Sequence, residues 1–311
     1  MIAYYISHSA REGLHHVLTP PATNAWVYGR DVTIPETEKL STQYGLDDSI
    51  VSDIHDKHEL PRVEYGTGGT MYLFVRSVEQ NTLGEVKTAP LLAIANGKQY
   101  FTLSPASYLQ PEDIIPQLEQ RKTADGSVLL LLTLNTLLIT YERFLRHTAQ
   151  SIDDIGHRLR SHEVENKDFL KFITIDENLN TYQTNLSATQ AVLERLKDNR
   201  HNMFGVRQLE VIDDLILHIR QMLVSVSSNT QRVASMRSTY TTIANNNLNQ
   251  RIKTLTVLTI LITLPNVIFG MYGMNVALPF MEQGWVFPMI IAATVLVVLG
   301  VYITVRRKKI L

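Results

Sequence analysis

The spacing of hydrophobic positions divides the chain into two parts. In residues 1–120, short β-type runs (WVYG, TMYLFVRSV, LLAIA and QYFTLS) alternate with Gly and Pro breaks and with helical stretches. From residue 127 onward, apolar residues recur at helical spacing, and no proline occurs before Pro265. The pattern predicts a cytoplasmic α/β domain over residues 1–125, followed by long α-helices.

Two long uncharged segments lie near the end of the chain. No residue between Lys253 and Glu282 is formally charged, and residues 254–272 alone would form roughly 28 Å of helix. Residues 284–305 are uncharged and rich in Ile, Val and Leu, so each segment can cross a bilayer. The sequence therefore predicts a helical cytoplasmic stalk over 126–250 and a two-helix transmembrane hairpin over 251–311.

A third apolar run, residues 128–139, could be mistaken for a membrane span. It has only about twelve residues, which is too short to cross the hydrocarbon core of a bilayer. We expect it to form a buried helix.

Basic residues flank only one side of the hairpin. Arg251 and Lys253 precede the first segment, the run RRKK at 306–309 follows the second, and the connecting loop has no Lys or Arg. Because basic flanks stay on the cytoplasmic side, we expect a multi-pass protein of the plasma (inner) membrane with both termini cytoplasmic. Glu282, the single charge of the loop, would then attract cations on the outer side.

The last long helix carries two distinct faces. An apolar face at alternating three and four spacing suits packing against a neighbouring helix, and its members are Leu209, Ile212, Ile216, Ile219, Leu223 and Val226. The second face, which we call the polar stripe, has small and neutral polar residues and continues into the membrane segment. Its members are Ser228, Gln231, Ser235, Ser238, Thr242, Asn245, Asn249, Ile252, Thr256, Thr259, Thr263, Asn266, Gly270 and Gly273.

Polar groups exposed to hydrocarbon cost free energy, so the polar stripe should face protein or water. One hairpin has too few helices to enclose a water path, and a pore would need several copies around an axis. Alternatively, the Thr side chains bond their own helix backbone, or the stripe is a tight helix-packing face. Its continuity with the soluble part of the helix favours a pore.

Composition excludes several other classes of function. A formal net charge of -1 does not favour a nucleic-acid partner, which needs clustered Lys and Arg. The absence of cysteine excludes disulfides and thiol chemistry. The segment GTGGT at 66–70 lacks the Lys of a phosphate-binding loop and is better interpreted as a hairpin turn. No enzyme motif is present, so we expect the protein not to be an enzyme.

Three further motifs stand out beside the RRKK tail. They are YGMN at 272–275, the preceding KTLTVLTI with Pro265 and, more weakly, SDIHDKHELPRVEY at 52–65. In these motifs the chain resembles the CorA family of magnesium transporters. The resemblance implies a CorA-like homopentameric funnel in which the first spans line the pore and the second spans form an outer ring.

The resemblance also implies positions for the ion sites. Gly273, Met274 and Asn275 would form the ion-selective outer ring, where neutral oxygens could hold a Mg²⁺ ion without stripping its water. Asp53 and Asp214 match a pair of acidic residues that would hold regulatory Mg²⁺ between subunits. The expected pore-lining residues are Asn249, Ile252, Leu255, Thr256, Thr259, Thr263, Asn266 and Gly270, in which only Ile252 and Leu255 represent a large apolar gate.

The expected function is channel-like, downhill influx of hydrated Mg²⁺, gated by cytoplasmic divalent cation. Two alternatives stay open. A zinc, cobalt or nickel transporter of the same superfamily is one, although zinc members usually depart from the central Met of GMN, which this sequence keeps. The other is a membrane-anchored helical scaffold or sensor, which gives no reason for the polar stripe.

Overall fold

The computed structural model describes residues 1–6, 15–19, 21, 25–97, 99–106, 109–121, 125–161, 166–274 and 283–307. The chain forms two compact units, Met1–Ser235 and Met236–Leu311. The boundary between them falls within one continuous helix, α6 (Val206–Tyr272). The three-part division with boundaries at 125 and 250 stays a prediction.

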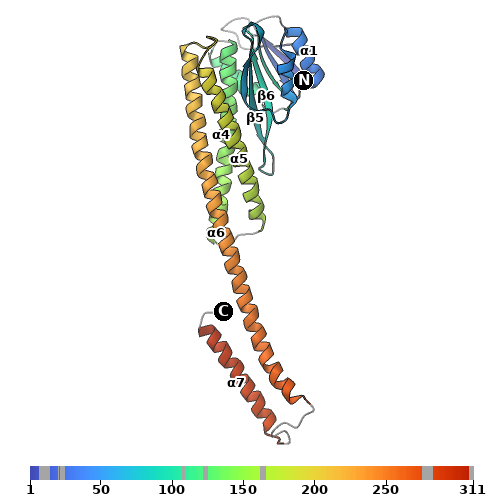
Figure 1. Ribbon diagram of the computed structural model, residues 1–311, viewed down its shortest axis with the longest axis vertical. Helices are drawn as coiled ribbons and strands as arrows, with labels where there is room; N and C mark the ends of the chain where they lie inside the picture. Colours follow the sequence, from blue (N-terminus) through green and yellow to red (C-terminus); the bar gives the residue numbers. More distant parts are fainter. Residues whose placement is uncertain are drawn as a thin grey trace. The chain divides into compact units, whose positions relative to one another are not determined.

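A mixed sheet forms the centre of the first unit (Figure 1). In the described part of the chain it has seven strands in the order β2-β1-β3-β7-β6-β5-β4. These are β1 (Ile2–Ile6), β2 (His15–Val17), β3 (Ala25–Arg30), β4 (Arg62–Tyr65), β5 (Met71–Gln80), β6 (Val86–Ala95) and β7 (Gln99–Ser104). Strands β3 and β7 are parallel, and the other neighbours are antiparallel. The four predicted β-type runs lie in β3, β5, β6 and β7, which confirms the α/β prediction.

One face of the sheet is covered by α1 (Ile34–Tyr44), α2 (Asp48–Ser52) and the short 3₁₀ helix η1 (Asp53–His55) (Figure 1). Thr33 and Glu36 form a capping box at the start of α1, and Gly45 ends it with φ of 64°, where glycine lacks the Cβ penalty. The core beneath these helices joins Leu40, Val51 and Ile54 to Val27, Tyr72, Phe74, Leu92 and Phe101 of the sheet.

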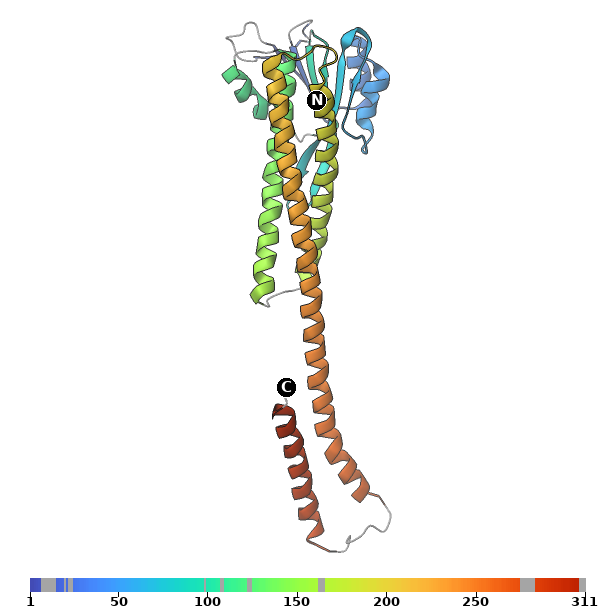
Figure 2. The same ribbon diagram turned by 60° about the vertical axis from the view of Figure 1, so that its left-hand side comes forward.

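The remaining helices of this unit form a bundle against the other face (Figures 1 and 2). They are α3 (Pro111–Arg121), α4 (Gly126–Ser161), α5 (Asn166–Lys197) and the first part of α6. The apolar face predicted for α6 packs into this bundle, because Ile212, Ile216, Ile219 and Val226 are buried.

The apolar run 128–139 lies within α4. By length and composition α4, α6 and α7 (Val286–Arg307) could all cross a membrane, but 61% of the apolar window of α4 is buried in protein. The corresponding values are 6% for α6 and 11% for α7. The prediction of a buried helix at 128–139 is therefore confirmed.

Directed hydrogen bonds attach the sheet to the bundle. Asn178 of α5 accepts a bond from the Val86 backbone N–H at 2.8 Å and donates one to the Gly84 carbonyl at 2.7 Å. The Tyr141 hydroxyl of α4 donates to the Arg76 carbonyl at 3.1 Å. Because buried polar groups cost free energy unless they are paired, these bonds fix the β5–β6 hairpin at one position along the helices.

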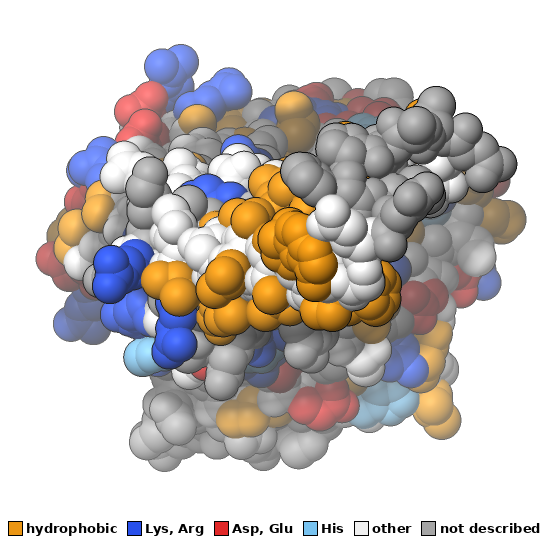
Figure 3. All heavy atoms as spheres, turned by 90° about the horizontal axis from the view of Figure 1, so that it is seen from below, with side chains coloured by type: hydrophobic (Ala, Val, Ile, Leu, Met, Phe, Trp, Pro, Cys, Tyr) orange, Lys and Arg blue, Asp and Glu red, His pale blue; other side chains and the backbone are white. Residues whose placement is uncertain are grey.

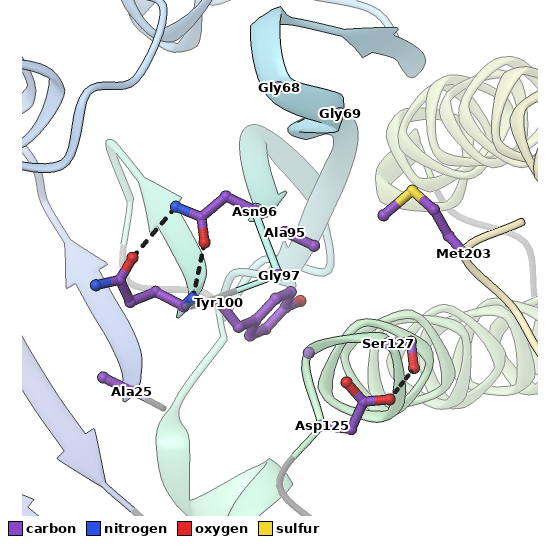
Figure 4. Close-up of a pocket in the computed structure, with 12 residues that line it drawn as sticks. Ala25, Gly68, Gly69, Ala95, Asn96, Gly97, Tyr100, Asp125, Ser127 and Met203 are labelled. Carbon is purple, nitrogen blue, oxygen red and sulfur yellow. Dashed lines mark hydrogen bonds between the residues drawn. The ribbon is translucent and has the colours of Figure 1, made fainter. Parts of the chain in front are cut away.

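The segment GTGGT joins two antiparallel strands, β4 and β5, which confirms the predicted hairpin turn. Gly68 and Gly69 have φ of 70° and 80°, a region that favours glycine. The turn borders a cavity of about 370 Å³ between the β6–β7 turn and the start of α4 (Figure 4). Asp125 is the single charged residue in its described lining, so the cavity lacks the cationic side chains of a phosphate site.

Candidate ion pathway and cation sites

The hairpin of the second unit buries little of its own surface. Helix α7 runs antiparallel to the last part of α6 (Figure 2). Hydrophobic side chains gather at the end of the hairpin when the molecule is seen from below (Figure 3). Within residues 251–274 and 283–307, only Val257, Val286 and Thr294 are buried. So large an exposed apolar surface on two long helices is stable in contact with lipid or with further protein. The structure thus agrees with the predicted membrane-spanning hairpin.

The polar stripe lies on the surface of α6 along its whole length. Among the described residues of one chain, all those predicted to line the pore are exposed: Asn249, Ile252, Leu255, Thr256, Thr259, Thr263, Asn266 and Gly270. The two apolar members are also open, with Ile252 51% and Leu255 64% exposed. A single chain therefore presents the stripe without enclosing a pathway.

The threonines of the stripe bond their own helix, as one of the alternatives predicted. The hydroxyls of Thr256, Thr259 and Thr263 each donate to the carbonyl four residues earlier, at 2.8, 2.9 and 2.7 Å. A hydroxyl that donates its proton in this way keeps its oxygen lone pairs as acceptors. The bond therefore directs acceptor oxygens outward, and the water molecules around a cation present hydrogens to such acceptors.

Asn266 adds an amide near the outer end of the stripe. Its side chain is exposed and has no hydrogen-bond partner within the part of the chain that the structure describes. An unpaired amide offers both a donor and an acceptor to water or to a neighbouring chain.

The outer end of α6 leads directly into the GMN sequence. Gly273 and Met274 are exposed, and their backbone N–H groups bond the Phe269 and Met271 carbonyls at 3.0 and 3.4 Å. The C-terminus of a helix carries partial negative charge on its last carbonyls, which favours a cation there. Asn275 and Glu282, like Lys308 and Lys309, lie outside the described residues.

The structure of one chain does not bring Asp53 and Asp214 together. Asp53 lies in η1 beside the sheet, whereas Asp214 is exposed on α6 and has no ion pair in the described part of the chain. No group of three or more His, Asp or Glu residues suited to a metal ion occurs among the described residues. The regulatory pair therefore stays a prediction, and it would require two chains.

The sequence did not reveal that Asp53 already has a cationic partner. The Arg62 Nη2 donates to Asp53 Oδ2 at 2.7 Å, and the same guanidinium also pairs with Glu59 and Glu64. A signal was present in ELPRVEY, because residues two apart on a strand share one face, which places Arg62 beside Glu64. The contact with Asp53 depends on the turn between η1 and β4, which no local pattern specifies.

These features define a membrane protein with a soluble α/β and helical unit and a C-terminal hairpin of two helices. A family model described as CorA-like Mg2+ transporter protein matches residues 22–307. The chain belongs to this family, and we conclude that it is a CorA-type transporter of divalent cations.

Individual relatives agree with this assignment. The cobalt/magnesium transport protein CorA of Methanocaldococcus jannaschii is 24% identical over 295 residues, covering 91% of this chain and 90% of the relative. The complete CorA magnesium transporter structure from M. jannaschii has a TM-score of 0.80 at 20% identity, covering 99% of this chain and 98% of the other. The ZntB cytoplasmic domain of Vibrio parahaemolyticus has a TM-score of 0.64 at 10% identity, covering 79% and 97%. The solved structures share the fold.

Proposed function

We propose that this protein is a channel-like transporter that carries hydrated Mg²⁺ downhill across the plasma membrane into the cell. The observation that carries the proposal is the exposed polar stripe of α6, which continues from the soluble unit to the GMN sequence. The named magnesium and cobalt transport of the M. jannaschii relative supports the choice of cation.

In this proposal the pathway forms when five copies place their polar stripes around one axis. Because Arg251, Lys253 and the RRKK tail lie on one side of the hairpin, both termini face the cytoplasm. Entry needs no coupled ion, since a divalent cation moving inward gains roughly 4.6 kcal/mol per 100 mV.

Selection occurs at a ring formed by Gly273, Met274 and Asn275 of the five copies. Mg²⁺ gives up water reluctantly and prefers oxygen ligands, so neutral oxygens can hold the ion with its hydration shell. An ion must also leave the ring, and neutral oxygens release it more readily than a ring of carboxylates. Glu282 attracts cations to the outer mouth.

Regulation uses Mg²⁺ held between Asp53 of one copy and Asp214 of the next. The residues fit this ion, because carboxylate oxygens are the ligands that Mg²⁺ takes in proteins, and both carboxylates are open to solvent. Bound metal favours the closed state, and its loss changes the relative free energy of closed and open states.

A transporter of zinc, cobalt or nickel is the second candidate. The ZntB cytoplasmic domain shares the fold of the soluble unit, so the fold alone does not distinguish the cations. Uptake assays with Mg²⁺, Zn²⁺ and Co²⁺ in competition separate the two candidates. Zn²⁺ flux that Mg²⁺ leaves unchanged would reject the magnesium assignment.

The direct test compares flux into reconstituted vesicles for the wild type and Asn275→Ala. We expect near-complete loss of Mg²⁺ flux in the variant, because each copy loses its amide oxygen at the ring. Asn247→Ala is the matched control, since Asn247 is an exposed asparagine of α6 outside the polar stripe, and it should retain flux. Flux that is the same in the wild type and Asn275→Ala, and no greater than that of protein-free vesicles, would favour the membrane-anchored scaffold.

A further inference from the structure

Arg62 is a cation that the fold holds in place beside Asp53. It lies on β4 directly opposite Phe74 of β5, and its guanidinium carbon is 4.2 Å from the centre of the Phe74 ring. Phe74 is 1% exposed and belongs to the core of the α/β layer. The guanidinium of Arg62 therefore lies over a buried ring of the core, and a cation over an aromatic face gains further attraction.

Three carboxylates share this one guanidinium. Arg62 bonds Asp53 at 2.7 Å and also pairs with Glu59 and Glu64. The Glu59 side chain is 13% exposed, and that of Asp53 is 48% exposed. Glu59 is thus an internal anchor for Arg62, whereas Asp53 is the partner that solvent cations reach most easily.

A divalent cation approaching Asp53 meets a carboxylate that is already engaged. The Oδ2 atom accepts the Arg62 N–H, so full coordination requires the bond to be shared or broken. The positive charge beside Asp53 also repels a second cation, and the interaction of charges a few ångströms apart is large when they are partly buried. Both effects weaken the binding of metal at Asp53.

We propose that Arg62 is a positioning residue that competes with the divalent cation for Asp53 and thereby raises the Mg²⁺ concentration at which the regulatory site fills. The inference rests on the proposed regulatory role of Asp53. Without metal, Asp53 already has a cationic hydrogen-bond partner in Arg62, which it shares with Glu59 and Glu64, so the metal-free state contains an internal ion pair instead of an unpartnered carboxylate. Metal binding at Asp53 therefore gains only the difference between the interaction of the carboxylate with the metal and its interaction with Arg62.

The experiment uses the full-length protein in lipid nanodiscs and measures its unfolding temperature against free Mg²⁺. Mg²⁺ bound to the folded protein raises the unfolding temperature, and the part of this rise that is missing in Asp53→Asn is the part due to the Asp53 site. For Arg62→Gln we expect the half-maximal Mg²⁺ concentration of that part to fall roughly three- to tenfold. Arg146→Gln is the matched control, because Arg146 pairs with Glu142 elsewhere on the surface, and its half-maximal concentration should equal that of the wild type.

Arg62→Lys keeps the positive charge and guards against a folding defect in Arg62→Gln. A lysine loses the forked contacts of the guanidinium, so its half-maximal concentration should lie between those of the wild type and Arg62→Gln. The double variant Asp53→Asn with Arg62→Gln should match Asp53→Asn alone, because Arg62 acts through Asp53.

An unchanged or higher half-maximal concentration in Arg62→Gln and Arg62→Lys would overturn the proposal. So would a wild-type Mg²⁺ response that Asp53→Asn leaves intact. That second result would leave the transport function standing, since flux through the pore is tested separately by Asn275→Ala. The transport function would instead be rejected by a wild-type Mg²⁺ flux no greater than that of protein-free vesicles.

Discussion

Helix α6 belongs to both units, and its two parts are used in opposite ways. In the first unit, one face of α6 is buried against the bundle, with Ile212 and Ile219 fully enclosed. In the described residues 251–272, the same helix buries only Val257. The apolar face of the first part is thus buried by its own chain, whereas the apolar surface of the second part must be covered by lipid or by other copies.

Polar groups follow the same division. In the first unit, some buried polar side chains bond distant parts of the chain, as when Trp26 donates to Thr102 and Tyr100 donates to Thr133, at 2.7 and 2.9 Å. In the hairpin, the threonines bond the preceding turn of their own helix. A fold that must stand alone needs long-range bonds, while a helix in lipid satisfies its polar groups locally.

The largest effect should come from truncating a buried leucine. Leu130 is 0% exposed in α4, and Leu130→Ala should lower the free energy of unfolding by about 2–5 kcal/mol, because it leaves a cavity. Leu258→Ala is the matched change in the hairpin, where the side chain is 52% exposed, and it should cost about 0.5 kcal/mol or less.

The loss of helical circular dichroism during denaturation reports both units, and Trp26 fluorescence reports the first unit alone when the other of the two tryptophans is removed by Trp285→Phe. Equal effects of the two alanine changes would show that residues 128–139 are not part of the core. They would also remove the contrast between the two units.

A smaller effect should separate two threonines that have the same local bond. Thr263 of the polar stripe and Thr294 of α7 both donate to the carbonyl four residues earlier at 2.7 Å, but Thr263 is exposed and Thr294 is buried. Valine preserves the shape and removes the acceptor oxygen. We expect Thr263→Val to reduce Mg²⁺ flux roughly two- to tenfold, since each copy loses about one hydrogen bond to the hydrated ion.

Thr294→Val should leave the flux close to that of the wild type. Flux into vesicles at fixed membrane potential measures both variants in one assay. If Thr294→Val is the more damaging change, the pathway lies on a different face of the hairpin from the polar stripe.

Local patterns explain which parts of this structure the sequence predicted. The hairpin follows from segment length and charge, and the apolar face of α6 follows from its spacing. These features depend on residues close together in the chain. The exposed polar stripe is likewise predicted from residues spaced three and four apart on one helix. The run at 128–139 is buried as predicted, but the helix that contains it is itself long enough to cross a membrane, so packing against the sheet and bundle decides its burial.

The remaining features depend on contacts between distant residues. The parallel pairing of β3 with β7 joins strands about seventy residues apart, and no local pattern specifies that register. The bonds of Asn178 to the β5–β6 hairpin cross 92 and 94 residues. The ion pair of Arg62 with Asp53 is nearer in sequence, but it is set by a turn and by the Phe74 ring beneath it.

The smallest effect should come from acid, and it should be confined to the first unit. His55 bonds the Thr37 hydroxyl at 3.0 Å, and burial lowers the pKa of its imidazole from 6.5. The folded state thus favours the neutral form of His55. The contribution of His55 to the free energy of unfolding is fully present above pH 6.5, and it is lost as the pH falls through 6.5 toward the pKa of the folded state. No formally charged residue lies between Lys253 and Glu282, so the first span should not respond.

Between pH 7.5 and 5.5, the unfolding temperature reported by Trp26 should fall, and His55→Gln should recover about 1–2 °C of that fall. Glutamine can bond the Thr37 hydroxyl but takes up no proton in this range, so the variant isolates the charge from the bond. An identical fall in His55→Gln and the wild type would assign the acid response to other groups. A comparable fall in a signal from Trp285 would show that acid sensitivity is shared by both units, against the division drawn from burial.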